Sequence, residues 1–312
     1  MRRGAVISVV AGAVAVMLVG GGLVWWVTRT PSAEDAARAY LDALSSGDVA
    51  TIDAMRAEKL DDAPERILAD AFAGAESFVT EAHIDEITAR EGSTRVLATA
   101  EIAGERRGLH FVMEQQNGRW ALTGDYLASV EVTPTLAGTE SPAGDSVWIG
   151  DALAPAGAPI LLLPAEYSIE AAPRGLLSGG TSVALGNRGR TSVEIEASVA
   201  AEATATAQAQ LNAYMDECTE PASAIPANCG LRVPWAADLA TLTSIVFRIE
   251  NRPTLAVSPD GRTFAAADGV VVATATGTTR DGDVESFSYR ADDWALRGTV
   301  AFRGNEMVLA VG

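Results

Sequence analysis

The chain begins with a long stretch in which charged side chains are absent. Residues 4–27 form this apolar run of 24 residues, and Arg2 and Arg3 precede it. A helix rises about 1.5 Å per residue, so a segment of this length spans the roughly 30 Å hydrocarbon core of a bilayer. Trp25 and Trp26 close the run, and indole rings suit the headgroup boundary. The pattern predicts a transmembrane signal anchor at 4–27 that contacts membrane lipid.

A cleaved signal peptide is the competing interpretation of this segment. Its apolar region would hold about 7–15 residues and would end at small side chains. The run is longer, and Trp25-Trp26-Val27 fills the place of those small residues, which favours an uncleaved anchor. Arginines before a first span favour an inside N-terminus. We therefore expect a single-pass protein of the cell membrane, with a cytoplasmic stub at residues 1–3 and extracellular C-terminal domains.

Beyond the anchor, the apolar residues take up a helical period. Between Ala37 and Leu44 they recur three or four positions apart, the spacing that places side chains on one helix face. Ser32 precedes this stretch as a capping residue, and Gly47 follows it as a terminating one. Two shorter helical stretches follow before Gly74. The sequence therefore predicts three consecutive helices at the start of an exported domain.

After Gly74 the pattern changes to the two-residue alternation of strands. Four strands are expected, and they cover Phe78–Arg90, Arg95–Ala103, Leu109–Gln115 and Trp120–Tyr126. Asn117-Gly118 predicts a two-residue hairpin between the last two, since a type I′ turn needs positive φ at both positions. Helices followed by an antiparallel meander predict an α+β domain over residues 32–130, with helices packed on one face of a curved sheet.

Two stretches of this domain carry a family resemblance. The helix–Gly-Asp–helix unit at 36–48 and the late hairpin that enters at Trp120 resemble a nuclear transport factor 2-like domain. Bacterial exported members often sit directly behind an anchor, and the layout is of the actinobacterial type. The resemblance covers residues 32–130, about a third of the chain. It implies a conical pocket between helices and sheet, which Asp, His or Tyr groups line in enzymes of the superfamily.

Residues of these types give a set of pocket-lining candidates implied by the resemblance. They are Tyr40, His83, Asp85, His110 and Asp125. A general base must be positioned beside its substrate with a tuned pKa, and no residue matches a specific catalytic motif, so no family active site is carried over. The alternative for Tyr40 is a core aromatic, and the alternative for both histidines is a surface or strand-edge position.

A second domain is expected after a small, polar connector, with the linker at residues 131–145 and the domain over 146–312. Short apolar strands alternate with turns, and one helix is predicted over about Ala200–Glu217. We therefore expect a mainly β extracytoplasmic domain with one long helix. A helix followed by a meander also fits a second cone-like domain, but the strands before the helix argue against that interpretation.

Cys218 and Cys229 are the only two cysteines of the chain. Two lone cysteines outside the membrane most simply form a disulfide. Closing so short a loop stabilises a fold by roughly 2–3 kcal/mol in the chain-entropy model. Ala207, Leu211 and Cys218 fall on one helix face, so the disulfide would fasten the following loop to the helix end. A metal site is disfavoured, because no C-x-x-C spacing occurs and the histidines lie far upstream.

Charge and missing motifs narrow the function. The formal net charge is −18 and is spread over both domains, which argues against nucleic-acid binding. Lys59, the only lysine, has Arg56 three positions before it, which excludes S-x-x-K chemistry. No nucleophile elbow, Walker loop, dinucleotide fingerprint or H-E-x-x-H motif occurs, and no metal or cofactor is expected. Asp281, Asp283 and Glu285 fit a solvated hairpin tip better than a calcium loop.

The amino-acid composition also indicates the kind of organism, and the observations above together indicate a class of function. Arginine in place of lysine, with abundant alanine and glycine, is typical of GC-rich coding sequence and indicates a high-GC bacterium. We expect a non-catalytic binding or scaffold protein of the bacterial cell envelope, with another envelope protein as its partner. The alternative is a small-molecule binding domain, isomerase or hydrolase that uses the cone pocket of residues 32–130.

Overall fold

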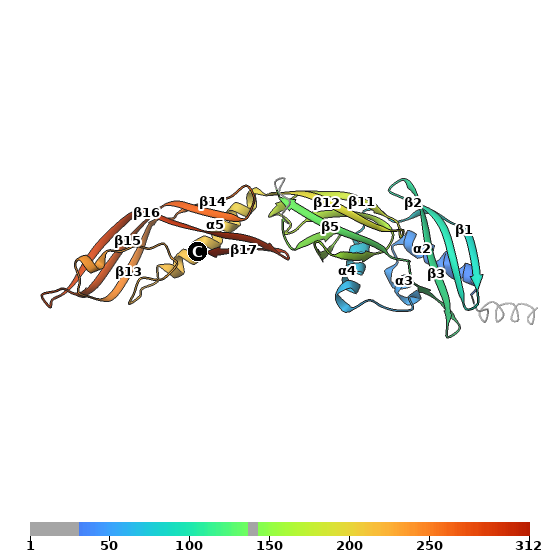
Figure 1. Cartoon of the computed structure of the whole chain (residues 1–312), viewed down its shortest axis with the longest axis horizontal. Helices are drawn as coiled ribbons and strands as arrows, with labels where there is room; N and C mark the ends of the chain where they lie inside the picture. The colour runs from blue at the N-terminus through green and yellow to red at the C-terminus, as the bar shows by residue number, and fades with distance from the viewer. Residues whose placement is uncertain (1–30, 137–142) are drawn as a thin grey trace, which may run out of the picture. The chain divides into compact units, whose positions relative to one another are not determined.

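The computed structural model describes residues 31–136 and 143–312 and shows an α+β protein made mostly of strands, with a few helices (Figure 1). The chain divides into two compact units. The first comprises the described residues up to Lys59 together with Val79–Tyr126, and the second comprises Leu60–Phe78 and Leu127–Gly312. The predicted anchor at 4–27 lies outside the described residues. Within them, no helix has both the length and the apolar character needed to cross a membrane.

The first unit contains two helices and a four-stranded sheet. Its elements are α2 (Ala33–Ser46), α3 (Val49–Met55), β1 (Thr80–Arg90), β2 (Ser93–Ile102), β3 (Glu105–Gln116) and β4 (Arg119–Thr123). The strands pair antiparallel in the order β1-β2-β3-β4, which is the predicted meander. Figure 1 shows this sheet curved, with α2 lying against it.

Local signals in the sequence set the ends of these elements. The Ser32 hydroxyl accepts a hydrogen bond from the Asp35 N–H at 3.1 Å, and the Asp35 carboxylate accepts from the Ser32 N–H at 3.0 Å, which completes a capping box on α2. Gly47 ends α2 with a φ of 69°, a conformation that a Cβ would strain. Asn117 and Gly118 have φ angles of 51° and 77°. The predicted hairpin between β3 and β4 is therefore confirmed.

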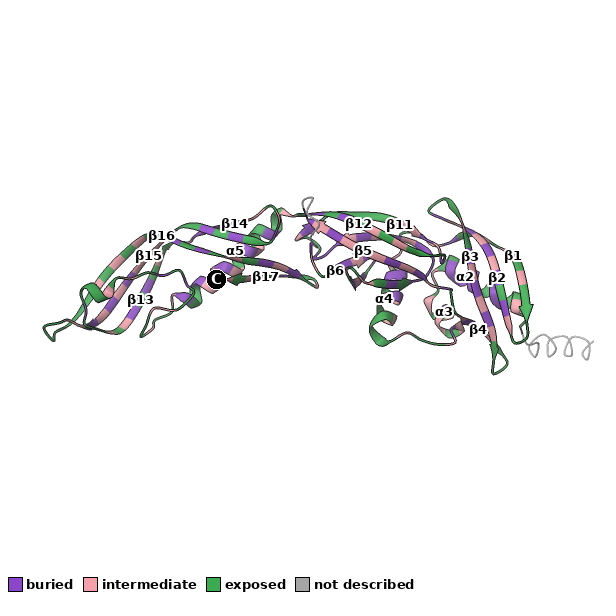
Figure 2. Cartoon of the chain, in the orientation of Figure 1, coloured by how far each residue is buried: buried purple, intermediate pink, exposed green. Residues whose placement is uncertain are grey.

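One face of α2 and one face of the sheet form the core of the first unit. Tyr40 and Leu44 of α2 are fully buried, and so are alternate residues of β3, namely Leu109, Phe111 and Met113. The rings of Tyr40 and Phe111 meet edge to face with their centroids 4.8 Å apart. Figure 2 shows the same alternation of buried and less buried positions along the strands. The predicted apolar face of the first helix is thus confirmed.

The second unit starts with one helix and eight strands. The helix is α4 (Asp62–Ala73), and the strands are β5 (Ala128–Leu136), β6 (Ser146–Ile149), β7 (Ala152–Pro155), β8 (Pro159–Leu162), β9 (Ala165–Ala171), β10 (Leu177–Ser178), β11 (Gly180–Leu185) and β12 (Arg190–Val199). They form two four-stranded sheets, ordered β10-β12-β5-β8 and β11-β9-β6-β7. The β5–β12 pair is parallel, and the other pairs are antiparallel.

Two boundaries differ from the sequence-based expectation. α4, expected with the sheet of residues 78–126, packs its buried side chains Leu68, Ala71 and Phe72 against β7 and β8 instead. The β6–β7 turn closes onto this helix, since a Cβ added at Gly150 would lie 2.8 Å from the Ala71 carbonyl oxygen. The expected linker at 131–145 begins inside a strand, because β5 pairs with β12 and β8 and continues to residue 136.

The rest of the second unit is a curled sheet, a half-barrel, with a helix along it (Figure 1). Its elements are α5 (Ala201–Cys218), the 3₁₀ turn η1 (Trp235–Ala237), β13 (Thr241–Asn251), β14 (Thr254–Val257), β15 (Thr263–Thr278), β16 (Val284–Arg303) and β17 (Glu306–Val311). The sheet is antiparallel in the order β13-β15-β16-β17, and β14 also pairs with β15. This part of the second unit therefore also has a helix packed on a curved sheet, the arrangement expected of a second cone-like domain. The strands of residues 128–199, which argued against that interpretation, form the two separate sheets described above.

α5 fills the half-barrel with small and apolar side chains. A row of residues four positions apart, from Ala203 to Met215, is fully buried in the same core as the inner face of the sheet. Cys218 ends the helix and forms a disulfide with Cys229. The helix expected before the cysteines and the disulfide are both confirmed.

β15 and β16 form one long hairpin that bulges rather than breaks. Asp268-Gly269 and Asp292-Asp293 are dipeptides typical of turns, yet both lie inside strands. Pairing continues past these points with register shifts between Ala266 and Val271. A bulge absorbs an extra residue without ending a strand, so polar residues typical of turns lie inside strands of 16 and 20 residues.

Candidate functional site

Tyr40, the first pocket candidate, lies in the core of the first unit. Its hydroxyl donates to the Tyr126 carbonyl oxygen at 3.3 Å, and burial raises the pKa of this phenol above its ordinary value. Phe111 and Leu44 pack in the same fully buried layer. A phenol held in this way supports the core, as its alternative interpretation proposes, and is not directed at a solvent-accessible ligand.

His110 and Asp125 lie outside the core that holds Tyr40. Because Leu109 and Phe111 on either side of His110 face the core, and successive side chains of a strand point to opposite faces, His110 lies on the outer face of the sheet. Its Nε2 is 4.0 Å from an Asp125 carboxylate oxygen. The two residues therefore form a pair outside the helix–sheet interior.

His83 and Asp85 come together on β1, the edge strand of the same sheet. The Nε2 atom of His83 lies 3.1 Å from Asp85 Oδ1, and the Thr99 hydroxyl donates to the other oxygen of Asp85 at 2.5 Å. Two register shifts in this part of β1, and a φ of 48° at Glu81, mark it as bulged. Bulges re-aim side chains, and here the bulged stretch lines a groove of about 480 Å³ shared with α2.

The chemistry of this α2–β1 groove favours binding over proton transfer. Leu41 and Ile84 give it apolar lining, and the charged residues that line it are mainly acidic. Both ring nitrogens of His83 face oxygen acceptors, the Glu81 carbonyl at 3.3 Å and the Asp85 carboxylate at 3.1 Å. Neither nitrogen is therefore aimed at a ligand as a base would be. The five candidates form two separate pairs and one core residue rather than one constellation.

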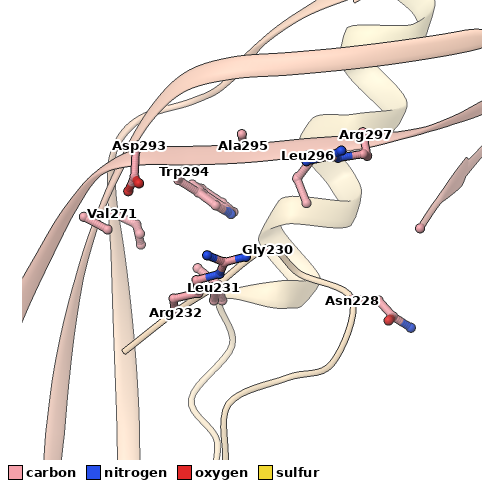
Figure 3. A pocket seen from close by; sticks show the side chains of 12 residues that line it. Asn228, Gly230, Leu231, Arg232, Val271, Asp293, Trp294, Ala295, Leu296 and Arg297 are labelled. Atoms are coloured by element: carbon pink, nitrogen blue, oxygen red, sulfur yellow. The ribbon is translucent and has the colours of Figure 1, made fainter. Parts of the chain in front are cut away.

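A second groove, which the sequence pattern did not reveal, lies along β16 in the second unit. Two adjoining hollows of about 340 and 320 Å³ share Leu231, Arg232, Val271 and Ala291 as lining residues. One wall is β16, and the other is the chain segment 228–234 (Figure 3). We call this combined hollow the β16 groove. In Figure 3 the side chains of Leu231 and Arg232 face Trp294 across it.

The segment wall of the β16 groove is fastened in place. The disulfide ties Cys229 to the end of α5 at Cys218, and the buried indole of Trp294 donates from Nε1 to the Cys229 carbonyl oxygen at 2.8 Å. Gly230 has a φ of 64°, and a Cβ added to it would lie 2.5 Å from the Ala295 carbonyl oxygen. Only glycine fits this approach, so the groove has a fixed width near Ala295.

The charge of the β16 groove differs from that of its surroundings. Residues 130–312 carry 11 arginines against 22 acidic residues. Arg232 and Arg297 nevertheless both line the groove, with Asp293 as the one carboxylate side chain among the lining residues. Within the described part of the chain, neither of these two guanidinium groups takes part in an ion pair. The groove therefore offers two uncompensated cations to a ligand.

No group of three or more His, Cys, Asp or Glu side chains within residues 31–136 and 143–312 is arranged to hold a metal ion. Asp281, Asp283 and Glu285 lie at or beside the tip of the β15–β16 hairpin, as expected from the turn signal.

No family model, no curated protein and no solved structure matches the chain. A proposal for its function therefore rests on the described residues and grooves.

Proposed function

We propose that the protein is a single-pass, membrane-anchored protein of the bacterial cell envelope whose extracytoplasmic units bind another envelope protein without catalysing a reaction. The observation that supports this best is the packed apolar core between α2 and β3 in the first unit. Tyr40, Leu44 and Phe111 are fully buried where the family resemblance implies a pocket. A filled core leaves the outer surfaces for recognition, whereas ligand chemistry needs polar groups that converge in a cavity.

Two further observations support the location, and a third supports the kind of partner. The apolar run at 4–27 follows Arg2 and Arg3, an arrangement that keeps the N-terminus inside. The Cys218–Cys229 disulfide suits an oxidising compartment. The even acidic excess of the exterior repels anionic lipid headgroups, which favours a protein partner over a membrane surface.

Location and partner binding are tested in the same cells. Protease added to spheroplasts that carry the full-length chain should remove the units beyond residue 31 and leave a membrane-embedded fragment. An Arg2→Glu/Arg3→Glu variant should show a lower accessible fraction, because it removes the positive charge that orients the span. Photo-crosslinking in intact cells followed by affinity purification should recover an envelope protein. A protected exterior, or no crosslinked protein under several growth conditions, would overturn the proposal.

The second candidate function is small-molecule binding by the first unit, which the α2–β1 groove with His83 and Asp85 supports. A ligand held there should raise the thermal midpoint of the full-length chain in a metabolite screen. The rise should disappear in a His83→Ala variant and persist in His110→Ala, the matched histidine on the outer face. Equal loss in both variants, or no rise with any compound, would contradict this function.

A further inference from the structure

Within the described residues, β16 has strand partners along most of one side but along only a short part of the other. On one side it pairs with β15 through most of its length, from Val284 to Thr299. On the other side it pairs with β17 only from Gly298 to Arg303. Among the described residues, no strand therefore pairs with residues 284–297 on that side. An unpaired edge presents a row of backbone donors and acceptors that can template another strand.

The other edges of this half-barrel are covered by specific contacts. The amide of Gln210 donates to the Met307 oxygen at 2.8 Å and accepts from the Leu309 N–H at 3.3 Å, which covers β17. Gln208 does the same for β14, with the Pro253 oxygen at 3.1 Å and the Leu255 N–H at 2.8 Å.

β13 is covered by backbone rather than by a side chain. Ala222 exchanges both backbone hydrogen bonds with Ile245, at 3.0 and 2.7 Å. For β16, by contrast, no backbone hydrogen bond joins residues 284–296 to any described residue beyond β15. Within the described half-barrel, residues 284–296 beside the β16 groove are thus the longest stretch of strand edge without a cover.

The direction of the free groups can be followed along β16. The Arg297 carbonyl accepts from the Gly312 N–H at 3.1 Å, on the β17 side of the strand. Residues two positions apart send their backbone groups to the same side, so Ala295 faces that side too, and its oxygen lies against Gly230. The contact with Gly230 limits an incoming strand at this point. The stretch from Val284 to Asp293 remains available.

The walls of the β16 groove specify what such a strand must carry. Leu231, Val233 and Pro234 line one side and Tyr289 and Ala291 the other, so a side chain that points inward meets apolar surface. Toward Ala295 the groove leads to the uncompensated Arg232 and Arg297. A strand antiparallel to β16 has its amino-terminal end at these arginines, because the two chains run in opposite directions.

We propose that the uncovered edge of β16 binds an extended peptide segment of a partner protein, antiparallel to Val284–Asp293. Its alternate apolar side chains face Leu231 and Val233, and an acidic residue at its amino-terminal end faces Arg232 and Arg297. Main-chain hydrogen bonds give such strand addition its affinity, and the side-chain pockets give it specificity. This inference rests on the proposed partner-binding function and names the kind of segment that the partner presents.

The probe is an acetylated, fluorescein-labelled peptide of roughly eight residues, Glu-Asp-Val-Thr-Val-Ser-Val-Thr, a length that pairs with most of the free edge. It is titrated into the full-length chain in detergent micelles, with fluorescence anisotropy as the readout. Saturable binding is expected, together with slowed amide exchange in residues 284–293. A peptide N-methylated at alternate amides should bind at least about tenfold more weakly, and so should one with lysine in place of both acidic residues.

The protein variants test the same contacts from the other side. Arg232→Glu/Arg297→Glu should weaken binding by about tenfold or more. Arg188→Glu/Arg190→Glu, which reverses two exposed arginines remote from the groove, should leave binding unchanged. Equal binding of the N-methylated peptide, equal binding by the groove variant, or no binding at about 1 mM peptide would overturn the proposal. A β16-mediated dimer in sedimentation would overturn it as well, because a second copy would then occupy the edge.

The two proposals fail in different ways. If the peptide binds as expected but the exterior proves protected from protease, the envelope location fails and the β16 site stands. If an envelope partner crosslinks to the chain while the peptide does not bind, the partner-binding function stands and the β16 site fails.

Discussion

Arg56 donates from Nε to the Tyr126 hydroxyl at 3.0 Å, although the chain separates these two residues by 70 positions. The Arg56 side chain is fully buried, and its Nη1 donates to Asp53 at 2.9 Å. The Tyr126 carbonyl in turn accepts from Tyr40. The buried guanidinium of Arg56 therefore links the end of α3 to Tyr126, which follows β4. Through Tyr126 it is also linked to Tyr40 of α2.

Removing the carboxylate of this buried ion pair should be costly. Asp53→Ala should lower the free energy of unfolding of the first unit by about 1–3 kcal/mol, because it removes a carboxylate that accepts a hydrogen bond from a buried guanidinium. Lys59→Met removes an exposed partner of the same carboxylate, 3.6 Å away, and should cost less than about 0.5 kcal/mol. Urea unfolding followed by hydrogen exchange in α3 and β4 measures both. Equal effects of the two variants would show that the buried pair contributes nothing.

The two glutamines of α5 should stabilise different strands independently. Gln208 and Gln210 lie about 200° apart around the helix axis, and each makes two backbone hydrogen bonds to one strand edge. Gln208→Leu should speed amide exchange in β14 alone, and Gln210→Leu in β17 alone, each by about 1–3 kcal/mol of opening free energy. Ala209→Leu, at the exposed position between them, is the control. Faster exchange in both strands of either variant would argue against separate edge contacts.

The disulfide should hold the segment wall of the β16 groove. A Cys218→Ser/Cys229→Ser variant should lose roughly 2–3 kcal/mol of unfolding free energy in the chain-entropy model. Exchange should rise most in residues 228–234, which form that wall. Urea unfolding of the oxidised chain and the variant, with peptide-level exchange, gives both values. An unchanged rate in residues 228–234 would mean that the Trp294 contact alone holds the segment.

Acid should loosen the contact made by Asp145. Its carboxylate accepts from the Gly304 N–H at 2.7 Å and from the Ser146 hydroxyl at 2.8 Å, and mainly the first bond holds the pKa of Asp145 below its ordinary value. A carboxyl whose pKa falls on folding stabilises the fold above its unfolded pKa of about 3.9 and loses that contribution as pH falls through the lowered value.

An Asp145→Asn variant tests this pH dependence. The stability difference between wild type and variant should be constant from about pH 7 down to about 5 and should shrink progressively at lower pH. Asp281→Asn, at the exposed hairpin tip, should follow the wild-type profile. A wild-type minus Asp145→Asn difference that grows as pH falls would reverse the sign of the argument.

Elements governed by local rules could be predicted from the sequence. Ser32, Gly47 and Asn117-Gly118 act through their own backbone geometry, so the first helix and the hairpin followed directly. The disulfide followed from there being two cysteines only. Each of these signals is complete within a few residues and does not depend on the rest of the fold.

Features that depend on distant partners could not be predicted in the same way. Pro134 and the polar stretch after it favour a loop, yet β5 forms because β12 pairs with it from more than fifty residues away. The bulges that carry β16 past Asp292-Asp293 depend on β15. The β16 groove is formed by that continuous strand together with the disulfide-held segment. Because the sequence predicts short strands separated by turns in this region, it does not predict the groove. The residues predicted around a cone pocket were chosen by type, and strand parity placed them on different faces.

Because α4 packs against β7 and β8, its apolar face is synthesised well before the strands that cover it. Phe72, the last buried residue of α4, leaves the ribosome 80 positions before Ala152, where β7 begins. At about 5–20 residues per second, the apolar face of α4 waits several seconds for the strands that cover it. Until then, the apolar face of this nascent helix stays exposed and can associate with other apolar surfaces. A recombinant fragment that stops at residue 130 would keep the helix in that unprotected state permanently.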